Sequence, residues 1–147
     1  MAQPALTEAL PGRALPGWAQ HQAFAALFRA IAAPDLAERW LTLLKGKPSK
    51  WAKIQPWRCW PGDLYRNWPV GASWPDLRDR AMTQALQARA PTWHGLACGH
   101  GGPEVVSLPP ADMRGWMDTL VEGFVVLVPG QLALIHNHEG GRWLWAA

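Results

Sequence analysis

The amino-acid sequence predicts an α+β domain in which N-terminal helices pack on a C-terminal, mainly antiparallel sheet. Apolar residues recur with helical spacing in residues 20–46 and 73–90, whereas most of residues 92–146 consists of short apolar segments between Gly-rich or Pro-Gly turns. The chain has 147 residues, of which 49% are hydrophobic and 17% charged, enough for one domain with its own core. We therefore expect a single domain at residues 20–147, preceded by a mobile arm at residues 1–19 that is rich in Pro and Gly.

An αα-hairpin is predicted at the start of this domain. Its first helix begins near Gln20, and the apolar residues at i, i+3, i+4 and i+7 are Phe24, Leu27, Phe28 and Ile31. Pro34 separates it from a second helix, which Gly46 ends. The apolar face of the second helix is predicted to contain Leu36, Trp40, Leu43 and Leu44.

A further helix is predicted after a Trp-rich segment at residues 47–74. Prolines restrict that segment to a short helical turn from Ser49 to Ile54. Ser73 and Asp76 then form a helix start close to a capping box, and the helix is expected to end near Ala90. Its inward-facing residues are predicted to be Leu77, Ala81, Ala85 and Leu86.

The last third of the chain is predicted to form the sheet. Residues 92–98 and 104–108 are expected to be strands joined by the Gly-rich turn at residues 99–102. Pro109 and Pro110 open another helix, with the apolar stripe Met113, Trp116, Met117, Leu120 and Val121. Residues 124–128, 131–137 and 142–146 are predicted to form a three-stranded antiparallel meander.

Several features of residues 41–146 occur together in a known group of proteins. They are the basic, Leu-rich segment Leu41–Lys53, a strand near a Cys, a helix introduced by Leu-Pro, and the ending Val-Pro-Gly-Gln-Leu-Ala-Leu followed by Glu139 and Arg142-Trp143. In these features the chain resembles a group of small bacterial proteins to which no function is assigned. The resemblance implies a bacterial source and an α+β domain, and it supplies no functional residues.

The composition also bears on location. Two cysteines, Cys59 and Cys98, are too few for a disulfide framework, and the N-terminus carries Glu8 and several prolines where a signal peptide has an apolar run. No apolar run approaches the roughly 20 residues of a membrane span. We therefore expect a cytoplasmic protein with free thiols that does not enter a membrane.

Basic charge and tryptophan are concentrated in the middle of the chain. From Arg39 to Arg66 there are seven basic residues and one acidic residue, a net charge of +6, whereas the whole chain carries +3. Trp and Arg are enriched at interaction hot spots, and the 11 Trp of this chain are hard to bury completely. We predict a non-enzymatic interaction module whose partner is another protein. The predicted binding surface consists of Lys45, Lys47, Lys50, Trp51, Lys53, Trp57, Arg58, Trp60 and Arg66.

The same basic, Trp-rich segment also allows single-stranded nucleic acid as a partner. Basic side chains neutralise phosphates, and aromatic rings stack on unpaired bases. Pro48 and Pro56 leave too little helix for the recognition helix of a helix-turn-helix.

The alternative from another class is a His/Cys metal site, with zinc as the candidate metal, or a metal-dependent enzyme. Because alternate residues of a strand share a face, His94 and Cys98 would lie together, followed by His100 in the turn, and His136 and His138 would share a face of their own strand. This hypothesis requires the two strands to be neighbours with the donors on one side.

Cys98 is also a candidate nucleophile, with the amides of residues 99–102 stabilising an oxyanion. The competing interpretation is an inert Cys buried in a core strand, which is far more common.

Overall fold

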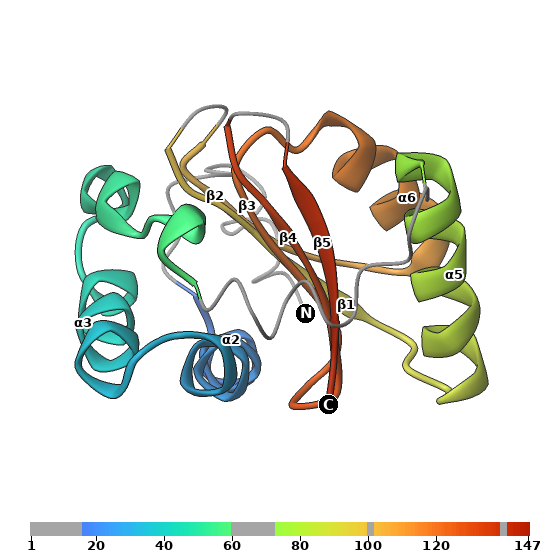
Figure 1. Cartoon of the computed structure of the whole chain (residues 1–147). Helices are drawn as coiled ribbons and strands as arrows, with labels where there is room; N and C mark the ends of the chain where they lie inside the picture. The colour runs from blue at the N-terminus through green and yellow to red at the C-terminus, as the bar shows by residue number, and fades with distance from the viewer. Residues whose placement is uncertain (1–15, 60–72, 100–101, 139–140) are drawn as a thin grey trace, which may run out of the picture.

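The computed structural model describes residues 16–59, 73–99, 102–138 and 141–147, apart from the side chain of Trp57. Within them, helices lie on both sides of a five-stranded antiparallel sheet with the strand order β2-β1-β3-β4-β5 (Figure 1). The strands are β1 (Trp93–Ala97), β2 (Glu104–Leu108), β3 (Gly123–Val128), β4 (Leu132–His136) and β5 (Arg142–Ala146). The predicted α+β fold class, with N-terminal helices and a C-terminal antiparallel sheet, is confirmed.

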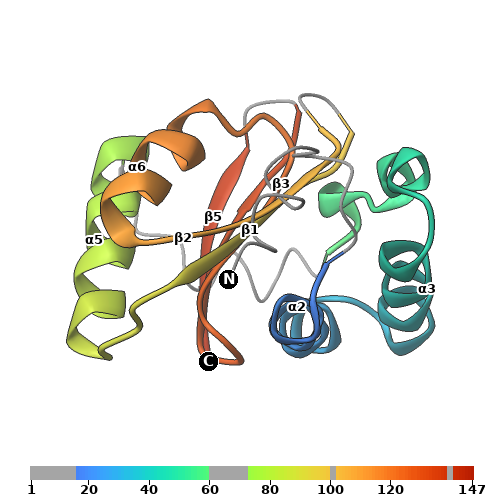
Figure 2. The ribbon, with the colours of Figure 1, turned by 180° about the vertical axis from the view of Figure 1, so that it is seen from behind.

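The helices form two separate layers. One layer holds α2 (Trp18–Ile31), α3 (Pro34–Lys45) and the short 3-10 helices η1 (Pro48–Lys53) and η2 (Pro56–Arg58). The other holds α5 (Trp74–Gln87) and α6 (Pro110–Thr119), which lie across the sheet from α2 and α3 (Figure 2). The sequence predicted α2, α3, α5, α6 and the turn of η1 but not η2, and it did not indicate that the helices divide between the two faces of the sheet. None of the helices in the described parts of the chain is long and apolar enough to cross a bilayer.

Turn residues set the strand pairings. β1 and β2 form a hairpin, and β3, β4 and β5 form the predicted meander, with Pro129 and Gly130 turning the chain between β3 and β4. β1 also pairs with β3, Leu96 lying opposite Phe124, so that β3 is the central strand.

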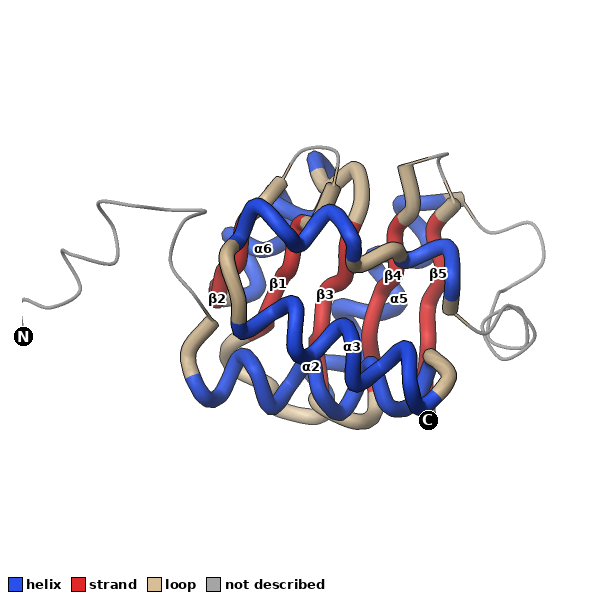
Figure 3. The backbone as a smooth tube through the Cα atoms, turned by 90° about the vertical axis from the view of Figure 1, so that its left-hand side faces the viewer, coloured by secondary structure: helices blue, strands red, loops and turns tan. Residues whose placement is uncertain are grey.

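An aromatic cluster joins the α2–α3 layer to the sheet. Figure 3 shows both helices in front of the strands. The ring of Phe28 lies 5.2 Å from that of Trp40 and 5.0 Å from that of Phe124, measured between centroids, and both pairs are edge to face. All three side chains are fully buried. Edge-to-face packing is a preferred aromatic geometry, so this cluster fixes how α2 and α3 sit on β3.

A second core fills the space between the sheet and the α5–α6 layer. Leu77 and Ala81 of α5 and Met117 of α6 are fully buried there, together with alternate residues of β3 and β4. Trp116 packs directly on Gly95 of β1, where a Cβ atom would lie only 2.4 Å from the indole ring. A side chain at position 95 would therefore have to displace the Trp116 indole.

Two predicted core positions face solvent instead. Leu86 of α5 is 55% exposed, because it lies nine residues after Leu77 and nine residues place a side chain on the opposite face of a helix. Val121 is also exposed, because α6 ends at Thr119 and the chain has already turned toward β3.

The aromatic cluster yields a stability prediction. Phe124→Ala should lower the free energy of unfolding by about 3–5 kcal/mol, because it opens a cavity between Phe28 and Trp40. Leu86→Ala is the control and should change it by less than about 0.5 kcal/mol. Urea unfolding followed by circular dichroism measures both. Equal losses in the two variants would contradict the assignment of these positions to core and surface.

Candidate functional site

The structure does not bring the four predicted metal donors together. β3 lies between β1 and β4, so the two strands that carry the donors are not neighbours. His94 faces the α2 layer, where its Nδ1 lies 2.7 Å from Ser107 Oγ, which also accepts a hydrogen bond from Gln20 of α2. His136 faces the other layer, where it contacts Trp74 of α5. The described residues contain no group of three or more His, Cys, Asp or Glu placed to hold a metal, and His100 lies outside them.

The remaining two donors lie near the same end of the sheet in different settings. His138 Nδ1 is 2.8 Å from Oε2 of Glu122, a carboxylate that is almost fully buried. Cys98 is fully buried in the α2-side core and is free, as is Cys59. Burial raises the pKa of the Cys98 thiol well above its ordinary value, and the nearby Glu122 carboxylate raises it further. Cys98 is therefore held as a protonated thiol, which is the wrong form for a nucleophile.

The predicted binding surface divides into exposed cations and a buried ring. Exposed side chains are found at Lys45, Lys47, Lys50, Lys53 and Arg58. Trp51, by contrast, is fully buried, because η1 turns its indole into the core beside Ile54. The predicted exposure of Trp51 is therefore corrected. The side chain of Trp57, and Trp60 and Arg66 altogether, lie outside the described residues.

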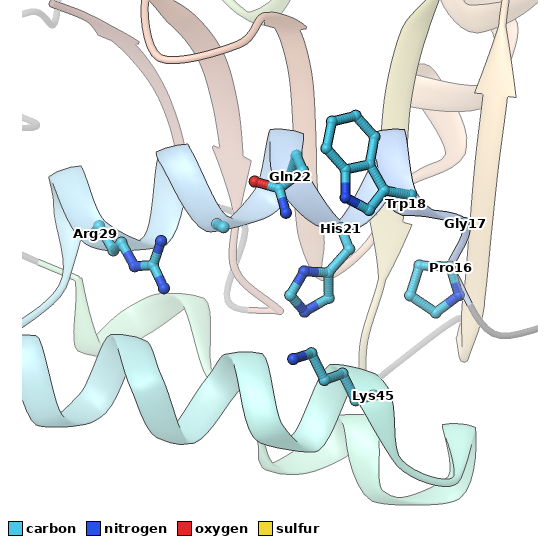
Figure 4. Close-up of a pocket in the computed structure, with 8 residues that line it drawn as sticks. Pro16, Gly17, Trp18, His21, Gln22, Arg29 and Lys45 are labelled. Atoms are coloured by element: carbon cyan, nitrogen blue, oxygen red, sulfur yellow. The ribbon is translucent and has the colours of Figure 1, made fainter.

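A groove of about 510 Å³ lies along the outer side of α2, next to the C-terminal end of α3 (Figure 4). Its lining consists of Pro16, Gly17, Trp18, His21, Gln22, Ala25, Arg29 and Lys45. The α2 residues among these recur at i, i+3, i+4, i+7 and i+11, which is one face of a helix. The αα-hairpin reverses the chain, so Lys45 at the end of α3 returns to the start of α2 and points toward His21 (Figure 4).

The two ends of this groove differ in chemistry. At one end the indole of Trp18 is 79% exposed, more than any other large hydrophobic residue in the described parts of the chain. At the other end Arg29 Nε donates to Glu38 Oε2 at 2.9 Å, and this hydrogen bond lowers the pKa of Glu38. Both of these side chains are largely exposed, so solvent and salt weaken the pair and leave it free to rearrange.

The middle of the groove contains an unused polar atom. Nε2 of His21 is shielded from solvent and has no hydrogen-bond partner among the described residues. Lys45 lines the opposite wall, and Lys47 and Lys50 follow it along η1. The groove therefore offers an aromatic surface and adjacent cations.

The sequence contained a signal for this groove, although the predicted helix began near Gln20 and left Trp18 in the N-terminal arm. Trp18 lies outside the apolar stripe of α2, on the face that carries His21 and Gln22. Core packing does not explain a Trp on the polar face of an amphipathic helix.

Comparisons of the chain with protein-family models, curated proteins and solved structures give no match.

His136 provides a pH prediction. Burial lowers its pKa to about 4, although a hydrogen bond to the carbonyl of Leu120 acts in the opposite direction. As pH falls from the ordinary value of 6.5 toward 4, the unfolded chain takes up a proton that the folded chain does not. The free energy of unfolding should therefore fall over this interval, by roughly 3 kcal/mol from this residue.

Urea unfolding at about pH 7 and about pH 5 tests this linkage. In His136→Gln the decline should shrink markedly. His94→Gln is the matched control. Burial also lowers the pKa of His94, but this side chain is only half-buried, so its removal should reduce the decline less than that of His136 does. An unchanged decline in His136→Gln would contradict the account.

Proposed function

We propose that this protein is a non-enzymatic interaction module that binds an acidic segment of another protein in the groove between α2 and α3. The observation that carries the proposal is the exposed indole of Trp18 at the rim of a groove whose other wall carries Lys45. Exposed Trp residues next to cations are typical of interaction hot spots.

The apolar part of the interaction would come from Trp18. Covering its ring would remove on the order of 150 Å² of apolar surface from water, which at about 25 cal/mol per Å² corresponds to about 4 kcal/mol before the costs of association. The groove continues from Trp18 past Ala25, giving room for further side chains of the partner segment.

The charge of the surrounding surface favours an acidic partner. From Arg39 to Arg58 the chain has six basic residues and no acidic one. Three of the exposed lysines, Lys45, Lys47 and Lys50, follow one another from the groove wall onto η1. A partner carrying Asp or Glu would be steered to this surface and paired with it.

Nucleic acid is supported less as the partner. Stacking of unpaired bases needs aromatic rings that alternate with the cations on the surface. Trp51, which lies between Lys50 and Lys53 in the sequence, is in the core and offers no such ring.

A displayed library of random peptides tests the proposal without a known partner. Peptides selected on the full-length protein should combine Asp or Glu with an apolar residue. Trp18→Ala should weaken their binding by about 30-fold, equivalent to the roughly 2 kcal/mol of a hot-spot residue, and Lys45→Glu should weaken it by at least about tenfold.

Leu86→Ala and Arg80→Glu are the matched controls, because both residues are exposed on α5 in the other helical layer. They should leave peptide binding unchanged. Selected peptides without acidic residues, binding that is insensitive to Trp18→Ala, or tighter binding of a single-stranded oligonucleotide would each refute the proposal.

A further inference from the structure

His136 and Arg142 form a directly opposed pair at one end of the sheet. They are cross-strand partners in the β4–β5 register, so their side chains share the face covered by α5 and α6. Both contact Trp74, the first residue of α5. The Arg142 guanidinium carbon lies 5.1 Å from the centroid of the indole ring, and the His136 ring meets that ring edge to face at 4.8 Å.

Each member of this pair has a polar atom that is shielded from solvent and unused. His136 is fully buried, and its Nδ1 lies 3.2 Å from the carbonyl oxygen of Leu120. A carbonyl only accepts hydrogen bonds, so Nδ1 carries the proton and Nε2 presents a lone pair. Neither His136 Nε2 nor Arg142 Nε has a partner among the described residues. The site thus contains one unused acceptor beside one unused donor.

The carboxylate of Asp118, which accepts a hydrogen bond from the same Trp74 indole, is already occupied. Asp118 of α6 accepts hydrogen bonds from Arg78 Nη1 on both of its oxygens, each at 3.0 Å, and from Trp74 Nε1, also at 3.0 Å. Among the described residues, no carboxylate forms an ion pair with Arg142, whose charge is met there only by the face of the indole. A half-buried guanidinium without an anion favours the binding of one.

We propose that His136, Arg142 and Trp74 form a binding site for a small oxyanion that retains a hydroxyl proton, the chemistry of inorganic phosphate at neutral pH. One oxygen of such an anion would accept from Arg142 Nε–H while its O–H donates to His136 Nε2. A fully deprotonated anion offers only acceptors and would leave the imidazole lone pair unmatched. A water molecule would satisfy both atoms but not the charge of Arg142. This site lies in the other helical layer from the groove and does not depend on the proposed function.

The test compares inorganic phosphate with sulfate, which are similar in shape but differ in that phosphate keeps at least one proton at neutral pH. Each is titrated into the ¹⁵N-labelled full-length protein at matched ionic strength, while NMR follows Arg142 Nε–H and Trp74 Nε1–H. Phosphate should shift both signals saturably, with a Kd in the millimolar range or tighter, and sulfate should bind at least about tenfold more weakly.

Two variants localise the effect. Arg142→Lys keeps the charge but removes the Nε–H donor, and it should weaken phosphate binding by at least about tenfold. Arg80→Gln, an exposed position on α5, should bind as the unmodified protein does. Should Arg142→Lys fail to fold, the phosphate–sulfate difference in the unmodified protein decides alone. Equal shifts with both anions, no shift with either, or shifts confined to the lysines of α3 and η1 would each overturn the proposal.

Discussion

The burial of β3 and β4 on both faces is the constraint on which the rest of this structure depends. Nearly every residue of the two strands is buried, and successive side chains enter different cores. Phe124 and Ile135 pack toward α2 and α3, whereas Val125 and Leu134 pack toward α5 and α6. A sheet of this kind needs a helical layer on each side, so the placement of α5 and α6 follows from the apolar character of the central strands.

The same constraint determines where polar chemistry can occur. The centre of the sheet is filled by apolar side chains, so His94 lies near the start of β1 on one face and His136 lies at the end of β4 on the other. The groove at Trp18 lies on the outer side of one helical layer, and the Trp74–Arg142 site lies at the end of the opposite core. The two proposed sites therefore occupy separate parts of the molecule and can be altered independently.

Local signals predicted the elements well, because turn and cap residues fix boundaries through neighbouring backbone geometry. Strands Glu104–Leu108 and Arg142–Ala146 begin and end where predicted, and the Ser73 hydroxyl caps α5 through the amide of Asp76. The sequence could not predict that β1 pairs with β3, or which face of each strand meets which helical layer, because alternation shows which residues share a face but not which face. The convergence of the histidines depended on that missing information, whereas the exposure of Trp51 depended on which way η1 turns its indole. Trp18 was detectable in principle as a large apolar residue on a polar helix face.

Amide hydrogen exchange of the unmodified protein tests the central claim most directly, because it reports how each strand is protected. If β3 and β4 are covered on both faces, their amides should exchange only through global unfolding and share one free energy of opening. Amides of the edge strand β2, whose residues are only half-buried or exposed, should exchange faster. Exchange of β4 amides as fast as those of β2 would show that one helical layer does not cover the sheet, and it would contradict the account.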